Sequence, residues 1–131
     1  MRNFYLIAMV FSLFITSCAK TPEVKPEVKN NLPGGAGGPY NLAFFSRLNG
    51  AGVNSRMYIK YGADKMPADT AMYDNKMNTM IEPGYGPHTH FDGLTTGTYY
   101  VLAKSATAQA DTIIVLTESS KKKQDIYLNL K

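Results

Sequence analysis

Apolar and polar residues alternate through most of the chain after residue 40, and none of this part keeps a helical spacing for long. Strict alternation puts every second side chain on one face of a β-strand, so it indicates strands with one buried face. Gly, Pro, Asn and Ser interrupt the alternation at short intervals and mark turns. We therefore expect strands near residues 42–48, 53–61, 71–73, 77–81, 89–91, 97–104, 111–117 and 125–130.

Several short strands separated by turns, with no helix, are typical of a two-sheet sandwich. The pattern is weakest in residues 62–87, which contain prolines at positions 67, 83 and 87 and glycines at 62, 84 and 86. The clearest pattern follows, where residues 97–104 are rich in Tyr and Val. The chain therefore predicts one small all-β domain, and the middle segment is its least regular part.

Residues 91–101 read Phe-Asp-Gly-Leu-Thr-Thr-Gly-Thr-Tyr-Tyr-Val. They resemble the segment F-x-x-L-x-x-G-x-Y-x-V of transthyretin-like, or carboxypeptidase-regulatory-like, domains, and residues 53–61 fit an early strand of such domains. The resemblance implies an immunoglobulin-like or transthyretin-like sandwich of about seven strands. Immunoglobulin-like domains share the shorter L-x-x-G-x-Y, so the motif implies a fold and no activity.

The same segment identifies candidate core residues. Gly97 permits a tight turn, after which Tyr99 enters the core with its hydroxyl free to bond the backbone near Leu94 or Thr95. Phe91 and Leu94 are expected to pack beside it. We therefore expect Tyr99 to have a structural role.

The first eighteen residues have the order of an export signal. Arg2 is followed by an apolar run at residues 4–15 that is too short for a permanent membrane span. The run ends in Ile15-Thr16-Ser17-Cys18, which resembles the bacterial lipobox. That resemblance implies cleavage of residues 1–17 and lipidation of Cys18, and several acyl chains anchor a protein firmly to a membrane.

The predicted anchor limits the remaining chemistry. Cys18 is the single cysteine, so once it is lipidated no thiol remains for a disulfide, a nucleophile or a metal. Residues 18–39 contain a repeated Pro-Glu-Val-Lys and a Gly-rich cluster, which favour an extended tether, and residues 40–131 form the domain. The residue after the cysteine is Ala19 and not the aspartate that serves as a retention signal in inner-membrane lipoproteins. We therefore expect a cell-envelope lipoprotein of the outer membrane, facing the periplasm or the exterior.

The charge of the chain is too mild to indicate nucleic acid as a partner. The formal net charge is +4, and losing Arg2 with the leader would make it +3. Lys121, Lys122 and Lys123 form the one basic run, for which we expect a solvated turn, with a membrane surface or an anionic ligand as the alternative. The sequence contains no nucleophile elbow, P-loop, H-E-x-x-H or dinucleotide fingerprint, so we expect no enzyme.

Both histidines of the chain lie in residues 88–93, His-Thr-His-Phe-Asp-Gly. On a strand, His88, His90 and Asp92 share one face, while Phe91 lies on the other. Because Phe91 is a candidate core residue, we expect the histidines to point to solvent or to a neighbouring loop. A solvated face without a cofactor is the simpler interpretation, and a metal site is the alternative.

The metal alternative draws on nearby methionines. Met77 and Met80 precede the histidine pair, and thioether with imidazole ligands suits copper. Zinc would need a further ligand, for which Asp92 is the nearest carboxylate. We therefore expect a lipid-anchored binding, adaptor or structural module of unknown partner, and keep a copper- or zinc-binding lipoprotein as the alternative.

Overall fold

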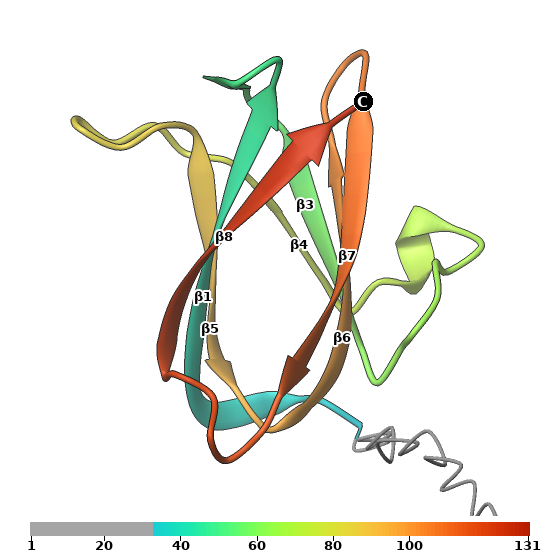
Figure 1. The fold of residues 1–131 in the computed structure, drawn as a ribbon. Helices are drawn as coiled ribbons and strands as arrows, with labels where there is room; N and C mark the ends of the chain where they lie inside the picture. The colour runs from blue at the N-terminus through green and yellow to red at the C-terminus, as the bar shows by residue number, and fades with distance from the viewer. Residues whose placement is uncertain (1–32) are drawn as a thin grey trace, which may run out of the picture.

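The chain folds into two β-sheets that pack face to face (Figure 1). The structure is a computed structural model and describes residues 33–131. It confirms the expected all-β, two-sheet sandwich, in which one 3-10 turn is the only helix among the described residues. The elements in chain order are β1 (Ala36–Leu48), β2 (Ala51–Gly52), β3 (Arg56–Tyr61), η1 (Thr70–Met72), β4 (Asn75–Asn78), β5 (His88–Leu94), β6 (Gly97–Lys104), β7 (Gln109–Leu116) and β8 (Lys123–Leu130).

The first sheet, here called the β1 sheet, is built around the longest strand. β1 pairs antiparallel with β5, where Leu42 faces Phe91, and with the short β2. On its other side, residues 41–48 pair in parallel with residues 123–130 of β8. The first and last strands of the domain therefore lie side by side (Figure 1).

The second sheet, here called the β6 sheet, has the strand order β4-β3-β6-β7 and is antiparallel throughout. Tyr99 of the central β6 faces Tyr61 of β3 on one side and Ile114 of β7 on the other. The two sheets meet where Gln109 and Lys131 exchange two backbone hydrogen bonds of 3.1 Å. This contact holds the C-terminal end of β8 against β7.

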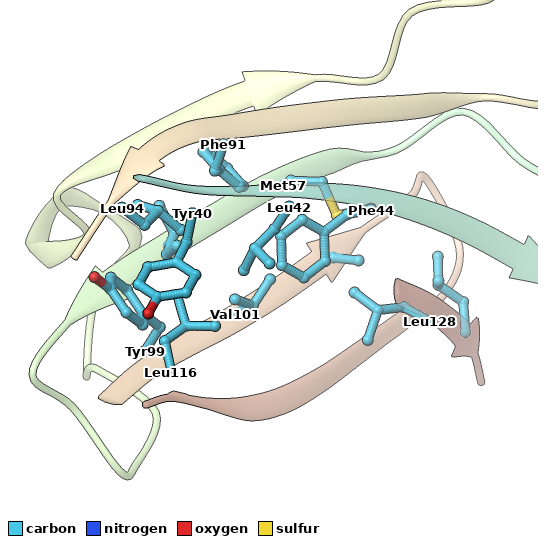
Figure 2. Close-up of a cluster of buried hydrophobic side chains, with 13 residues drawn as sticks. Tyr40, Leu42, Phe44, Met57, Phe91, Leu94, Tyr99, Val101, Leu116 and Leu128 are labelled. Carbon is cyan, nitrogen blue, oxygen red and sulfur yellow. The ribbon is translucent and has the colours of Figure 1, made fainter. Parts of the chain in front are cut away.

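Alternate residues of the strands fill the space between the sheets (Figure 2). Phe91, Leu94 and Tyr99, the expected core residues, are at most 2% exposed. The rings of Phe44 and Phe91 meet edge-on, with centroids 5.7 Å apart. Burying one side chain of this size contributes about 1.5–3 kcal/mol, so this cluster supplies the main stabilisation. Its members are Tyr40, Leu42, Phe44, Met57, Ile59, Phe91, Leu94, Tyr99, Val101, Ala103, Leu116, Leu128 and Leu130.

The segment between β3 and β5 differs from the prediction. A strand is predicted at residues 71–73, but η1 forms there because the Asp69 carboxylate accepts the Ala71 backbone N–H at 2.9 Å and caps the turn. The strand predicted at residues 77–81 lies at β4 instead. Its pairing ends where Asn78 faces Arg56, because Arg56 is the first residue of β3.

The folded domain begins before residue 40, the boundary predicted from composition. β1 starts at Ala36, and Pro33 already forms a β-bridge with Thr98 of β6. This corrects the predicted tether of residues 18–39, whose last residues belong to the sandwich. The predicted leader, the lipobox and the rest of the tether lie outside the described residues.

Glycines of this first stretch pack closely rather than acting as a hinge. Gly34 lies against the ring of Tyr99, and a Cβ atom at position 34 would overlap that ring. A Cβ atom at Gly38 would overlap the carbonyl group of Leu94. The glycine-rich composition predicts a flexible segment here. Instead, the absence of a side chain lets the backbone lie close to Tyr99 and Leu94.

The hydroxyl of Tyr99 joins this start of the domain to the turn between β5 and β6. It lies 2.8 Å from the carbonyl oxygen of Thr95, as the sequence predicts. It also accepts the backbone N–H of Gly35 at 2.9 Å and lies 3.0 Å from the Gly35 carbonyl oxygen. A hydroxyl carries one proton, so it can donate to either carbonyl while it accepts from Gly35.

Candidate functional site

The candidate site is the outer face of the β1 sheet, where β5 presents the histidines. Thr89 and Phe91 point into the sandwich, with exposures of 0% and 2%. His90 and Asp92 lie on the opposite face, as alternation predicts, and are half-buried and exposed respectively. His88 shares their face but is only 2% exposed because, of the two expected directions, solvent or a neighbouring loop, it takes the loop.

His88 is buried because the segment before β5 folds back over it. Met80 and His88 exchange two backbone hydrogen bonds of 2.7 and 3.0 Å, which brings residues 80–87 alongside the start of β5. The ring of Tyr85 lies 5.9 Å from the imidazole of His88, and the ring of Phe45 stacks on it at 5.2 Å. This cover depends on a contact that alternation within β5 does not reveal.

Hydrogen bonding orients the His88 ring. Its Nδ1 lies 2.8 Å from the carbonyl oxygen of Gly86, and a carbonyl can only accept, so Nδ1 carries a proton. In the neutral imidazole the other nitrogen, Nε2, then has a free lone pair. Nε2 lies 3.8 Å from the Glu82 carboxylate, and the ring meets that of His90 edge-on at 4.9 Å.

Three rings cross the face at one level of the sheet, one from each of the strands β8, β1 and β5. We call Tyr127, Phe45 and His88 the aromatic row. Phe45 is directly paired with both of the others in the register of the sheet. Its ring stacks on Tyr127 at 4.9 Å and on His88 at 5.2 Å, with interplanar angles of 22°. Arg47 adds a cation to the row, with its guanidinium carbon 4.3 Å from the centre of the Tyr127 ring.

The face is hollowed on both sides of the aromatic row. One hollow lies toward the β7–β8 turn, and hydrogen-bonding side chains line it, among them one lysine and two carboxylates. These polar lining residues are Asn41, His90, Asp92, Lys123, Gln124 and Asp125. The other lies toward the β1–β2 turn and is lined by aromatic and cationic groups, among them Phe45, Arg47, Tyr85 and Tyr127. Asp125 borders both hollows, so the outer face is one continuous polar and aromatic surface.

The structure brings together only some of the predicted metal ligands. Met80 is paired directly opposite His88, so the register places the two side chains on the same face. Met77 instead packs against the core between the sheets and is separated from the histidines by the β1 sheet. Asp92 borders the hollow beside His90. Among residues 33–131, no three His, Cys, Asp or Glu side chains are placed to hold a metal ion.

The outer face of the β6 sheet is covered over β6 by its own chain, whereas Ile113 and Val115 of β7 are exposed on it. Tyr73, which follows η1, packs with Tyr100 and Leu102 of β6 in a second buried cluster. The Tyr100 hydroxyl donates a hydrogen bond to the Asp111 carboxylate. Burial, this hydrogen bond and the negative charge of Asp111 together raise the pKa of Tyr100 above the ordinary value for tyrosine. This face is thus closed over its middle, whereas the face of the β1 sheet is open.

Several residues of the open face were missed from the sequence. Phe45, Arg47 and Tyr127 alternate with core residues in β1 and β8, so their outward direction was available from the pattern. Their proximity depends on the parallel pairing of β1 with β8, two strands at opposite ends of the domain. No local signal in either strand identifies that partner.

No protein-family model matches this chain, and a search of curated proteins found no match. In the part of the chain that the structure describes, no helix is long and apolar enough to cross a membrane.

Proposed function

We propose that this protein is a lipid-anchored binding module of the bacterial cell envelope, without a catalytic role of its own. The anchor would be Cys18, at the end of the lipobox-like sequence Ile15-Thr16-Ser17-Cys18. The resemblance of residues 91–101 to transthyretin-like domains agrees with this proposal, because that resemblance implies a fold and no chemistry. The outer membrane is the proposed location.

The observation that carries the binding role is the open outer face of the β1 sheet. It combines the aromatic row with polar groups in two adjoining hollows. Sites for ligands and partners characteristically combine aromatic surface with a few placed polar groups. The opposite face of the sandwich is less suited to this role, because residues of its own chain cover Tyr100 and Leu102.

Site-specific photo-crosslinking in intact bacteria tests the proposed face. A photoreactive amino acid replaces Asn129, which is exposed on the outer face and paired with Arg47. The matched control replaces Lys76, which is exposed on β4 of the other sheet. We expect a discrete adduct from position 129 and not from position 76, and we expect Tyr127→Ser to reduce it. Equal adducts from both positions, or none from either, would contradict the proposed face.

A second candidate, copper or zinc binding, is supported by the orientation of His88. Its Nδ1 is occupied by Gly86, which leaves Nε2 available beside His90 and on the face that Met80 shares. Metal-binding histidines typically have the second ring nitrogen held in this way. The candidate ligands are then His88, His90 and Met80, with neither Met77 nor Asp92 required.

Metal titration separates this candidate from the first. We would titrate the protein with Cu(I), Cu(II) and Zn²⁺ and follow the imidazole resonances of both histidines. A metal role predicts binding tighter than millimolar that is lost in His90→Ala and weakened in Met80→Leu, whereas Met77→Leu retains it. Binding that is millimolar or weaker, or that survives the loss of His90, would rule out this candidate.

A further inference from the structure

The chain enters the domain at the end of the sandwich where β6 begins. Pro33 forms its bridge with Thr98 at the start of β6, and Gly35 bonds Tyr99 beside the β5–β6 turn. Cys18 lies fifteen residues before Pro33. Fifteen residues span at most about 50 Å when fully extended, so a lipid on Cys18 would keep this end of the domain near the bilayer.

The turn between β7 and β8 lies at this same end, away from the C-terminus (Figure 1). Its backbone is tied to β1, because the Asn41 N–H donates to the Lys122 carbonyl at 2.7 Å. The Tyr40 hydroxyl also donates to the carbonyl of Thr117 at 2.9 Å. The turn is therefore held in place beside the entry of the chain.

This turn carries the basic run of the sequence. Lys121, Lys122 and Lys123 are all exposed, and within residues 33–131 none of their ammonium groups forms an ion pair. Glu118 is the one acidic residue of the turn. Asp92 and Asp125 line the same hollow of the outer face of the β1 sheet as Lys123, and Asp64 and Asp69 precede η1. The turn itself therefore carries an excess of positive charge, from Lys121 and Lys122 against Glu118.

We propose that Lys121, Lys122 and Lys123 contact anionic lipid headgroups of the membrane that holds Cys18. The proposal rests on the lipid anchor of the proposed function. Each lysine at an anionic surface favours association about fivefold, so three would favour contact about 100-fold over no contact. The β7–β8 turn would then face the bilayer, and the β6–β7 turn at the opposite end would point away from it.

Headgroup quenching on the lipidated full-length protein tests this orientation. Because Cys18 would carry the lipid, a single introduced cysteine provides the only thiol for a fluorophore. One label is placed by Ser119→Cys in the β7–β8 turn and the other by Ala106→Cys in the β6–β7 turn, both exposed positions. Each labelled protein is bound to vesicles of phosphatidylcholine alone, or with added phosphatidylglycerol, that carry a headgroup quencher.

We expect quenching at position 119 in the anionic vesicles only and little quenching at position 106 in either. Replacing Lys121, Lys122 and Lys123 together by Gln should abolish the quenching at 119. The matched control, Lys104→Gln with Lys131→Gln, removes exposed charge from the opposite end and should leave it unchanged. High salt should also weaken it, because screening shortens the range of the attraction.

Two results would overturn the proposal in distinguishable ways. Equal quenching at 119 and 106, or quenching at 119 that survives the triple Gln substitution, contradicts the lysine contact and leaves the anchor standing. A chain that fails to float with either kind of vesicle contradicts the anchor, and with it this orientation.

Discussion

At the scale of single residues, the hydroxyl of Tyr99 does more than its motif suggests. Its bond to Thr95 could be predicted, because the two residues lie only four positions apart across the short β5–β6 turn. Its bond to Gly35 could not, because Gly35 lies 64 positions away in a stretch whose composition indicates a tether. One hydroxyl thus fixes both the β5–β6 turn and the entry of the chain.

Tyr99→Phe should therefore destabilise the domain by about 1–3 kcal/mol, because it leaves the Gly35 N–H without its acceptor. Urea unfolding followed by far-ultraviolet circular dichroism measures this change. The control is Tyr127→Phe, since within residues 33–131 the exposed Tyr127 hydroxyl forms no hydrogen bond. Equal losses of stability in the two variants would show that the Tyr99 hydroxyl does not stabilise the domain through Gly35.

Tyr100 gives a prediction of pH dependence. Burial, followed by the hydrogen bond and charge of Asp111, raises the pKa of its hydroxyl in the folded state above the unfolded value near 10. The contribution to stability is therefore fully present below about pH 10 and is lost as the pH rises through the folded pKa. The midpoint of urea unfolding should accordingly fall as the pH rises above about 10.

Asp111→Asn separates this effect from the titration of lysines in the same range. It removes the negative charge that disfavours the tyrosinate, so the fall in stability above about pH 10 should be shallower than in the unsubstituted protein. An identical pH dependence in the two proteins would exclude Asp111 as a cause. Burial alone would then account for the raised pKa.

At the scale of elements, residues 33–39, where the folded domain begins, show how composition can mislead. A run of glycines predicts flexibility when nothing else is known. In the sandwich, Gly34 and Gly38 are glycines because the Tyr99 ring and the Leu94 backbone occupy the space where a Cβ atom would lie. The sequence contains the glycines but does not say what approaches them.

Gly38→Ala should therefore destabilise the domain by about 1–3 kcal/mol, because a rigid backbone carbonyl must move to admit the methyl group. Gly35→Ala is the matched control, since a Cβ atom there would meet only the Thr95 hydroxyl oxygen, at an ordinary 3.7 Å. Thermal unfolding of both variants provides the comparison. If Gly38→Ala is as stable as Gly35→Ala, residues 36–39 behave as a tether after all.

β5 shows the limit of alternation as a guide. The period of two assigns the side chains of residues 88–92 to faces, and the faces found there are those predicted, whereas a register shift after Phe91 turns Leu94 into the core. It does not predict exposure, because His88 and His90 share one face and only His88 is covered by residues 80–87. Whether a side chain on the outer side of a sheet is buried depends on other segments of the chain, which the pattern of the strand does not reveal.

At the scale of the whole molecule, the fold class followed from the sequence, whereas the proposed binding face did not. Short alternating strands require two sheets to bury their apolar faces, whatever their order. The candidate face depends on one long-range contact, the parallel pairing of β1 with β8. That pairing places Tyr127 beside Arg47 and beside Phe45, whose ring stacks on His88.

In the whole molecule, both the presentation of the open face and the orientation of the basic turn depend on the lipid anchor. The most direct measurement is the intact mass of the protein purified from bacterial membranes. We predict a chain that begins at Cys18 and carries a diacylglyceryl thioether and an acylated amino group, both lost in Cys18→Ala. A mature chain with an unmodified Cys18 thiol would contradict the lipid-anchored account.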